Sequence, residues 1–413
     1  MAGKAIQEYY AKKLLFPIFQ RELDGKFGQT PDSLSLIASL QDADTIHGEK
    51  LVVKPDVCIG KKGKNNLILA GADAQKAREF LKKNYGTIVE VGGVKGKLDA
   101  FLVEPFVEHD KEFFAAVVSR ADCDEILYSP QGGVDVEENW DSMRIAKVGL
   151  SEEPDAGKIG QQLQVQDALV QKFLAACVRA ARETGSPYLE FNPFTVAGGK
   201  IYVLGTVARL DTHESFAKRK LWNGIPFKDA FGTTKTEQEK KVEILDESTS
   251  GSLKLTVFNK NAPLWLLVAG GGASVVFADT AADNGLAEKL GNYGEYSGNP
   301  TEQETFEYSS LLFELVEQSN APKKAVVIGG AIANFTDIAA TLKGVCTAIE
   351  KHAGALKNAN VRFFVRRGGP NYKQGLEEIR KTCGKNGIHA EVFGPEKPMT
   401  DVIALASEWI SEK

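Results

Sequence analysis

The chain has 413 residues, of which 43% are hydrophobic and 25% are charged, and its formal net charge is −5. This composition is typical of a globular protein of two or three domains, and the net negative charge excludes the broad basic surface on which nucleic-acid binding depends. The five cysteines form no CxxC pair, which argues against a disulfide framework or a zinc site and indicates a reducing compartment. No apolar run of 18 residues and no signal-peptide core is found, so we predict a cytoplasmic protein without a membrane span.

Residues 1–245 are predicted to form one domain of mixed structure. The first 20 residues have the pattern of an amphipathic helix, and a longer helix is predicted over about 158–183. Strand-like stretches lie at 51–56, 97–107, 112–121, 124–130, 188–196 and 200–204. The last two are joined by Ala197-Gly198-Gly199, which is a hairpin signal. Antiparallel strands with segregated helices indicate an α+β fold.

The second half of the chain has a different pattern of polar and apolar residues. Residues 233–251 are polar and charged, which is typical of a linker, although part of this stretch could form a surface helix. From residue 253 onward, a strand, a glycine-rich loop and a helix follow one another repeatedly. The strands are predicted at 263–269, 324–328, 363–365 and 389–393. Apolar strands that alternate with helices predict a parallel, doubly wound α/β sheet over residues 246–413.

Two permanent cations, Arg366 and Arg367, follow one of these strands and precede a pair of glycines. In a doubly wound sheet, ligands bind outside the carboxyl ends of the strands, and the same edge should carry Asn334 and Thr336 at a helix start. The arginine fork suits carboxylate or phosphate, and a helix start favours anions. The pattern therefore predicts a small anion with several charges. Three plainer interpretations stay open: a surface ion pair, helix caps and tight turns.

The first domain has features that fit a nucleotide. Lys54 lies on a predicted strand, and a loop rich in glycine and lysine follows at 60–64, as a loop that covers phosphates would. The stretch VEPFVEH offers backbone groups beside Pro105 for a purine, and Glu112 could accept a ribose hydroxyl. Lysine loops are also commonly solvated surface, and the P-loop pattern GxxxxGK[ST] is absent from the sequence.

A magnesium site is predicted on one strand of the same domain. Glu190 and Asn192 alternate in the stretch LEFNP, so their side chains should lie on one face of the strand. Carboxylate and amide oxygens are ligands that Mg²⁺ accepts when it bridges nucleotide phosphates. A purely structural pair for Glu190 stays open as the alternative.

Several longer stretches carry a family resemblance: KAIQEYYAKKLL, LVVKPD, EPFVEH, GGVDVEENWD, YLEFNP, VAGGGASVVFADT, NYGEYSGNPTEQET, IGGAIANFTD and FFVRRGGPNY. On them the chain resembles the N-terminal part of ATP-citrate lyase nearly from end to end, and in particular the separate smaller subunit of its two-subunit form. The wider group is that of acyl-CoA synthetases of the succinyl-CoA synthetase type. The resemblance implies an ATP-grasp domain over 1–245, followed by a flavodoxin-like, citrate-binding domain over 246–413.

The resemblance also implies site residues at the matching positions. ATP would bind at Lys54, Lys62, Gly63, Pro105, Val107 and Glu112. Mg²⁺ would be held near Asn192, and a minor metal site at the domain junction would use Asp246, Thr249 and Gly251. Citrate would bind at Gly298, Asn334, Thr336, His352 and Arg367. Of these, His352 stands where the family often has a tyrosine near citrate.

The mechanism that the resemblance implies needs a second protein. ATP phosphorylates a histidine, citrate takes the phosphoryl group, and CoA attacks citryl phosphate to give citryl-CoA, which is cleaved to acetyl-CoA and oxaloacetate. The five histidines of this chain lie in no motif for the first step. The family places the phosphohistidine, the CoA site and a citrate-synthase-like domain on a larger partner subunit. We therefore expect a hetero-oligomer in which this chain alone is inactive and supplies no catalytic residue.

One position departs from the family pattern. Gly205, in the stretch IYVLGTVARLD, stands where the family has an aspartate that binds metal and nucleotide phosphate. We therefore expect weakened or differently liganded Mg-nucleotide binding, and tighter Mg-ADP binding after Gly205→Asp.

Three alternatives stay open. One is a citryl-CoA synthetase subunit, which differs mainly in its partner. The second is the β-subunit of another acyl-CoA synthetase, such as succinyl-CoA synthetase; the VRRGGPNY and ANFT motifs disfavour it, because a dicarboxylate needs fewer ligands. The third is a regulatory or scaffold subunit with a degenerate ATP site, for which Gly205 is the only support.

Overall fold

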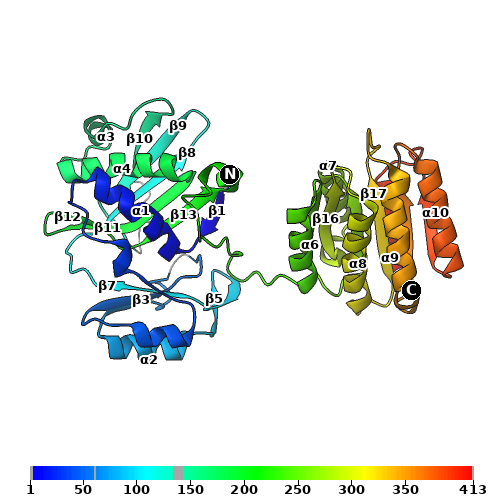
Figure 1. The fold of residues 1–413 in the computed structure, drawn as a ribbon, viewed down its shortest axis with the longest axis horizontal. Helices are drawn as coiled ribbons and strands as arrows, with labels where there is room; N and C mark the ends of the chain where they lie inside the picture. The colour runs from blue at the N-terminus through cyan, green and yellow to red at the C-terminus, as the bar shows by residue number, and fades with distance from the viewer. Residues whose placement is uncertain (1–2, 60–61, 134–142, 412–413) are drawn as a thin grey trace. The chain divides into compact units, whose positions relative to one another are not determined.

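The computed structural model of the chain describes residues 3–59, 62–133 and 143–411. Most of the GGVDVEENWD motif lies outside the described residues, and so do the first two residues of the predicted phosphate loop. The chain forms two compact units, Met1–Thr233 and Thr234–Lys413 (Figure 1).

The predicted domain boundary after residue 245 falls inside helix α6 (Glu237–Ser248). Thr236 and Glu239 form a capping box at the start of this helix, which satisfies two backbone N–H groups. The Gln238 side chain donates a hydrogen bond of 3.0 Å to Glu314, so the helix packs within the second unit. The stretch predicted as a linker is therefore largely a surface helix of the second unit, which the sequence had left open.

The first unit is built on an antiparallel sheet. Its strand order is β1-β13-β11-β8-β9-β10, and β12 pairs with β11. The bounds are β1 (Gly3–Ile6), β8 (Phe113–Ser119), β9 (Cys123–Ser129), β10 (Arg144–Gly149), β11 (Tyr188–Ala197), β12 (Lys200–Val203) and β13 (Thr206–Asp211). The Ala197-Gly198-Gly199 hairpin between β11 and β12 is present as predicted, with both glycines at positive φ.

Three helices supply apolar side chains to the core against this sheet. The bounds are α1 (Glu8–Glu22), α3 (Ala156–Gln162) and α4 (Ala168–Thr184). Phe19 of α1 and Phe173 of α4 pack against each other, and both contact Phe191 of β11 in T-shaped geometry, with ring centroids 5.3–5.5 Å apart. Burial of such rings contributes about 1.5–3 kcal/mol each. The single helix predicted over 158–183 was wrong in one respect: it is broken before Asp167, whose carboxylate caps α4.

A smaller antiparallel sheet completes the first unit, in the order β2-β7-β3-β4, with helix α2 against it (Figure 1). The bounds are β2 (Ser35–Ile37), β3 (Leu51–Pro55), β4 (Leu69–Ala72), α2 (Ala74–Asn84) and β7 (Phe101–Pro105). A hairpin of β5 (Ile88–Val91) and β6 (Val94–Lys97) and a short helix α5 (Ser215–Lys218) lie beside these layers. The predicted strand 97–107 is thus divided between β6 and β7.

The second unit has one sheet in the order β14-β16-β15-β17-β18-β19, in which only β14 is antiparallel. The bounds are β14 (Ser252–Val257), β15 (Leu264–Ala269), β16 (Asn292–Ser297), β17 (Lys324–Gly330), β18 (Val361–Arg366) and β19 (His389–Phe393). Counted in chain order, the five parallel strands lie in the order 2-1-3-4-5. The structure confirms the predicted parallel sheet and adds β14 and β16.

Helices cover both faces of this sheet. Their bounds are α7 (Gly271–Asp283), α8 (Glu302–Gln318), α9 (Ile338–Asn358), α10 (Tyr372–Lys385) and α11 (Asp401–Ser411). One apolar cluster joins α8, α9 and α10 to the sheet, and a separate cluster joins α7 and α11 to its other face. Within the described chain, no helix combines the length and the apolar character needed to cross a membrane.

Candidate functional site

The adjacent arginines at the end of β18 have different roles in the structure. Arg366 is buried and donates hydrogen bonds to three backbone carbonyls, those of Lys397 (2.9 Å), Gly330 (3.0 Å) and Pro395 (3.3 Å). It therefore ties the loop after β19 to the end of β17, and its fork is fully engaged. Arg366 is a structural residue.

Arg367 is buried as deeply, with 1% of its surface exposed, but it is not compensated. Its Nε atom is buried without a hydrogen-bond partner, and no carboxylate among the described residues forms an ion pair with it. A buried cation without a partner is costly, because it has lost its hydration and gained nothing in exchange. The plain surface ion pair is thus excluded, and the geometry indicates an anion that is supplied from outside.

The surroundings of Arg367 leave room for its guanidinium. A Cβ atom on Gly330 would lie 1.8 Å from Nη1 of Arg367, so only glycine at this position allows the side chain to cross the end of β17.

Tyr296 is a second neighbour of Arg367. Burial raises the pKa of the Tyr296 hydroxyl and the charge of Arg367 acts against this rise, so the two groups interact electrostatically. The Tyr296 hydroxyl is also buried without a partner.

Asn334 and Thr336 lie at the same edge of the sheet as Arg367. The backbone N–H of Ala333 donates to the carbonyl of Gly368 (3.0 Å), so the loop after β17 is joined to the loop that follows Arg367. The helix cap of α9 is Asp337, whose carboxylate accepts from Ala340 (3.1 Å). The interpretation of Asn334 and Thr336 as helix caps is therefore wrong, and capping of α9 does not engage either side chain.

Gly298 also lies at this edge, at the carboxyl end of β16, where its φ is +75°. His352 does not. It follows Ile338 by four turns of α9, about 21 Å along the axis at a rise of about 1.5 Å per residue. Its Nδ1 lies 2.7 Å from a carboxylate oxygen of Glu317 in α8. The structure thus brings together every predicted citrate residue except His352.

The predicted minor metal site does not form a ligand cluster. Asp246 accepts from the backbone of Leu253 (2.7 Å) and pairs with Lys254. Thr249 accepts from the backbone of Gly251 (3.0 Å), as in an ordinary turn. Over residues 3–59, 62–133 and 143–411, no three His, Cys, Asp or Glu side chains are placed to hold a metal ion together.

The first unit contains a cavity of about 700 Å³ between strands of its two larger sheets. The predicted residues that line it are Lys54, Lys62, Gly63, Glu112, Glu190 and Asn192. Apolar side chains cover part of its wall, among them Ile68, Phe114 and Leu127. A concave site with an apolar wall and a few convergent polar groups is the usual form of a small-molecule site.

Pro105 and Val107 line a different, more open hollow of about 540 Å³ beside Lys50 and Tyr202. They are linked to the cavity through His109, whose Nδ1 lies 2.7 Å from the Val107 carbonyl and whose Nε2 lies 3.0 Å from Glu112. The structure therefore separates these two predicted nucleotide residues from the others.

The predicted magnesium donors already have protein partners. The side-chain oxygen of Asn192 accepts from the backbone of Gly133 (2.9 Å), and Glu190 accepts from the Tyr188 hydroxyl (2.5 Å). Gly205 lines the same cavity, but a Cβ atom there would lie 2.0 Å from the backbone oxygen of Asn192. An aspartate at this position would collide with the main chain. This contact opposes the expectation that Gly205→Asp tightens nucleotide binding, which stays a prediction.

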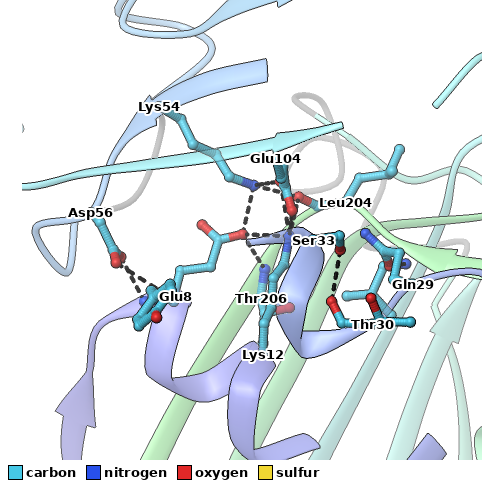
Figure 2. A network of polar contacts seen from close by, with 12 residues as sticks. Glu8, Lys12, Gln29, Thr30, Ser33, Lys54, Asp56, Glu104, Leu204 and Thr206 are labelled. Atoms are coloured by element: carbon cyan, nitrogen blue, oxygen red, sulfur yellow. Dashed lines mark hydrogen bonds and ion pairs between the residues drawn. The ribbon is translucent and has the colours of Figure 1, made fainter. Parts of the chain in front are cut away.

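Lys54 belongs to a buried charge network that the sequence did not predict (Figure 2). Its ammonium lies 2.6 Å from Glu8 and 2.7 Å from Glu104, and it also donates to the Leu204 carbonyl. Glu104 is held from the other side by Lys12 (2.6 Å), which is fully buried. Burial opposes the charge of Glu8, but the lysines outweigh it and hold the pKa of Glu8 far below its usual range.

Family models match both halves of the chain. The model of the ATP-citrate synthase ATP-grasp domain matches residues 2–222, and that of the ATP citrate lyase citrate-binding region matches residues 233–408. The ATP-citrate synthase alpha chain protein 2 of Arabidopsis thaliana is 39% identical over 100% of this chain and 99% of its own length. The ATP-citrate synthase of Homo sapiens is 36% identical over 98% of this chain, which corresponds to 38% of that longer protein.

A solved structure is also similar over nearly the whole chain. ATP citrate lyase from Methanothrix soehngenii, in complex with citrate and coenzyme A, has a TM-score of 0.89 and 39% sequence identity, and the match covers 98% of this chain and 100% of that one. Both halves of the chain, the cavity with its lysines and the edge with Arg367, lie within these matches. The chain belongs to the ATP-citrate synthase family, the ATP citrate lyases.

Proposed function

We propose that this chain is the ATP- and citrate-binding subunit of an ATP-citrate lyase, which converts citrate, ATP and CoA to acetyl-CoA, oxaloacetate, ADP and phosphate. The observation that carries the proposal is the buried, uncompensated guanidinium of Arg367 at the edge that also carries Asn334 and Thr336. One carboxylate of citrate would pair with Arg367, and backbone amides with Thr336 would take another.

The second unit is then a flavodoxin-like domain. The strand order 2-1-3-4-5 of its parallel strands is the flavodoxin order, in which ligands bind beyond the carboxyl ends of the strands. Arg367, Asn334 and Gly298 all follow such ends. The similar Methanothrix structure, which was determined with citrate and coenzyme A, supports the same ligand here.

The first unit would bind ATP in the 700 Å³ cavity, with Lys54 and Lys62 toward the phosphates and Ile68 and Phe114 along the base. The donor set fits a magnesium ion that is held mainly by phosphate oxygens and water, with Glu190 and Asn192 as protein oxygens at the cavity wall. When bound, Mg²⁺ neutralises phosphate charge during phosphoryl transfer. Glu190 and Asn192 would have to exchange their present partners, Tyr188 and Gly133.

A larger partner subunit would complete the enzyme. None of the described residues that line the cavity is a histidine, so the group phosphorylated by ATP would come from the partner. The human relative, of which this chain spans 38%, supports such a division of one long chain into two. The phosphoryl group would pass from that histidine to citrate, which Arg367 orients, and CoA would then displace phosphate.

The test is oxaloacetate release by this chain reconstituted with the larger subunit. We expect activity that requires ATP, citrate and CoA, and no activity from this chain alone. Arg367→Met should abolish activity, whereas Arg380→Met should not, because it removes an exposed cation that donates to the Val392 carbonyl and pairs with Glu377 at 3.8 Å. Full activity of Arg367→Met would refute the proposal.

A further inference from the structure

The carboxylate of Glu8 contacts two of the lysines that line the cavity, Lys54 and Lys62. It is the first residue of α1, only 6% of its surface is exposed, and it lines the cavity. Its Oε1 is 2.6 Å from Nζ of Lys54 and its Oε2 is 3.1 Å from Nζ of Lys62. The backbone N–H of Thr206 also donates to it (3.2 Å), and Nζ of Lys12 lies 3.2 Å from its Oε1. Figure 2 shows the contacts of Glu8 with Lys54 and Thr206.

Lys54 has no donor left for a ligand. An ammonium group has three N–H donors, and those of Lys54 are engaged by Glu8, Glu104 and the Leu204 carbonyl. A phosphate group can therefore reach Lys54 only by taking the place of one of these three acceptors.

Glu8 is the acceptor that can be exchanged. Lys12 contacts all three acceptors, at 2.6 Å from Glu104, 3.1 Å from the Leu204 carbonyl and 3.2 Å from Oε1 of Glu8, so its contacts do not distinguish them. Of the two carboxylates, Glu8 lines the cavity and Glu104 does not. Leu204 lines it as well, but its acceptor is a backbone carbonyl, which cannot turn away as a side chain can.

The backbone below Glu8 is fixed, so only its side chain needs to move. Asp56 caps α1 by accepting from the backbone of Glu8 (2.6 Å) and of Tyr9 (3.1 Å), and Gln7 donates to the Asp56 carbonyl (2.7 Å). The helix start therefore stays in place while the Glu8 side chain turns away.

We propose that Glu8 is an internal anion that competes with the nucleotide's phosphates for Lys54 and Lys62 and so sets the affinity of the site. This inference rests on the proposed nucleotide site in the first unit. A phosphate group carries about −1.5 to −2 charges at pH 7 against one for the carboxylate, so phosphate-bearing ligands are favoured at the lysines. The competition also lowers the apparent affinity for the favoured ligands, since each must first displace Glu8.

The experiment measures the binding of ADP and of AMP to the full chain by calorimetry. Glu8→Gln keeps the shape and one acceptor for Thr206 but removes the competing charge. We expect it to tighten ADP binding by at least about tenfold and AMP binding by a similar factor, because the phosphates of both ligands must displace the same carboxylate.

Two further variants make the outcome specific. Glu112→Gln removes a carboxylate from the same cavity that contacts His109 and no described lysine, and it should not tighten ADP binding. Lys62→Met should weaken ADP binding in any background. Glu8→Asp, which withdraws the carboxylate from Lys62 by one methylene group, should give an intermediate gain and serves if Glu8→Gln does not fold.

The outcomes separate the inference from the proposed site. If Lys62→Met weakens ADP binding but neither Glu8 variant tightens it, the competition is refuted and the site stands. An equal gain from Glu112→Gln also refutes it, because any lost charge would then suffice. If neither the natural chain nor the Glu8 variants bind ADP, both the site and the competition are refuted. Thermal unfolding of each variant confirms that the compared proteins are folded.

Discussion

The guanidinium of Arg367 occupies the space that a side chain on Gly330 would fill, since a Cβ atom on Gly330 would lie 1.8 Å from its Nη1. Position 330 is the last residue of β17, and position 367 follows the last residue of β18, the neighbouring strand. At the end of β17, Gly330 has no side chain. At the end of the neighbouring strand β18, Arg367 extends its guanidinium into the space that this leaves. This arrangement keeps a buried charge at the edge where the ligand is expected.

Gly330→Ala should therefore displace the guanidinium and weaken citrate binding by about tenfold or more, because a bidentate pairing depends on orientation. Calorimetric titration of citrate measures this. Gly354→Ala is the matched control, since a Cβ atom there meets nothing within 4 Å and lies inside α9. It should not change the citrate affinity, and it should stabilise the helix by up to about 1 kcal/mol. Equal citrate affinity in both variants would contradict the assigned position of Arg367.

Arg366→Met and Arg367→Met should have opposite effects on stability. Loss of Arg366 leaves three backbone carbonyls without their donor, and we expect a loss of about 2–4 kcal/mol. Arg367→Met removes a buried cation that has no counter-charge, so it should be neutral or stabilising. Urea unfolding of the two variants without citrate tests this pair. A comparable loss in both would mean that Arg367 is a structural residue.

Two neighbouring tyrosines provide a second matched pair. The hydroxyl of Tyr308 donates to the Lys254 carbonyl (2.7 Å), and Tyr308→Phe should lose about 1–2 kcal/mol. The hydroxyl of Tyr296 is buried without a partner, so Tyr296→Phe should lose nothing in the absence of citrate. Thermal unfolding compares them, and a larger loss for Tyr296→Phe would show that its hydroxyl has a partner in solution.

Stability below about pH 4 should depend on Glu8. Burial alone would raise the pKa of Glu8, but Lys54, Lys12 and Lys62 hold it well below the ordinary value of about 4.3. A depressed folded pKa means that the charge stabilises the fold above the unfolded pKa, and that this contribution is lost as pH falls. Glu8→Gln lacks this contribution, so its free energy of unfolding should fall less steeply with decreasing pH than that of the natural chain. Identical slopes in acid titrations would contradict the charge network.

Gly205→Asp should destabilise the first unit by about 1–3 kcal/mol without tightening Mg-ADP binding, because its Cβ meets the Asn192 carbonyl at 2.0 Å. Gly205→Ala should lose a similar amount, since the collision is with the Cβ atom itself. Unfolding measurements together with Mg-ADP titration decide this. Tighter Mg-ADP binding in the aspartate variant alone would show that the main chain yields and that the missing carboxylate matters.

The candidate site could be predicted from the sequence where unusual residues follow the ends of predicted strands. Arg367, Asn334 and Thr336 could be predicted together, because the carboxyl ends of parallel strands meet at one edge. The sequence could not separate Arg366 from Arg367, since the carbonyls that engage Arg366 lie 29 to 36 residues away in the chain.

Other features were missed for reasons of packing. Strand β16 reads NYGEYS and has few apolar residues, because Asn292 fills its place in the core by bonding to both backbone groups of Leu266. Glu8 looked like one charge of an amphipathic helix, since its partner Lys54 is 46 residues away. Only the fold shows that α1 begins at the cavity wall.

The central claim is that Arg367 is a buried cation whose partner is citrate. The most direct test is calorimetric titration of citrate into the full chain and its Arg367→Met variant, with succinate as the comparison ligand. We predict citrate binding that is at least about tenfold tighter than succinate binding and that is lost in Arg367→Met. Equal citrate binding by the variant, or no preference of the natural chain for citrate over succinate, would contradict the claim.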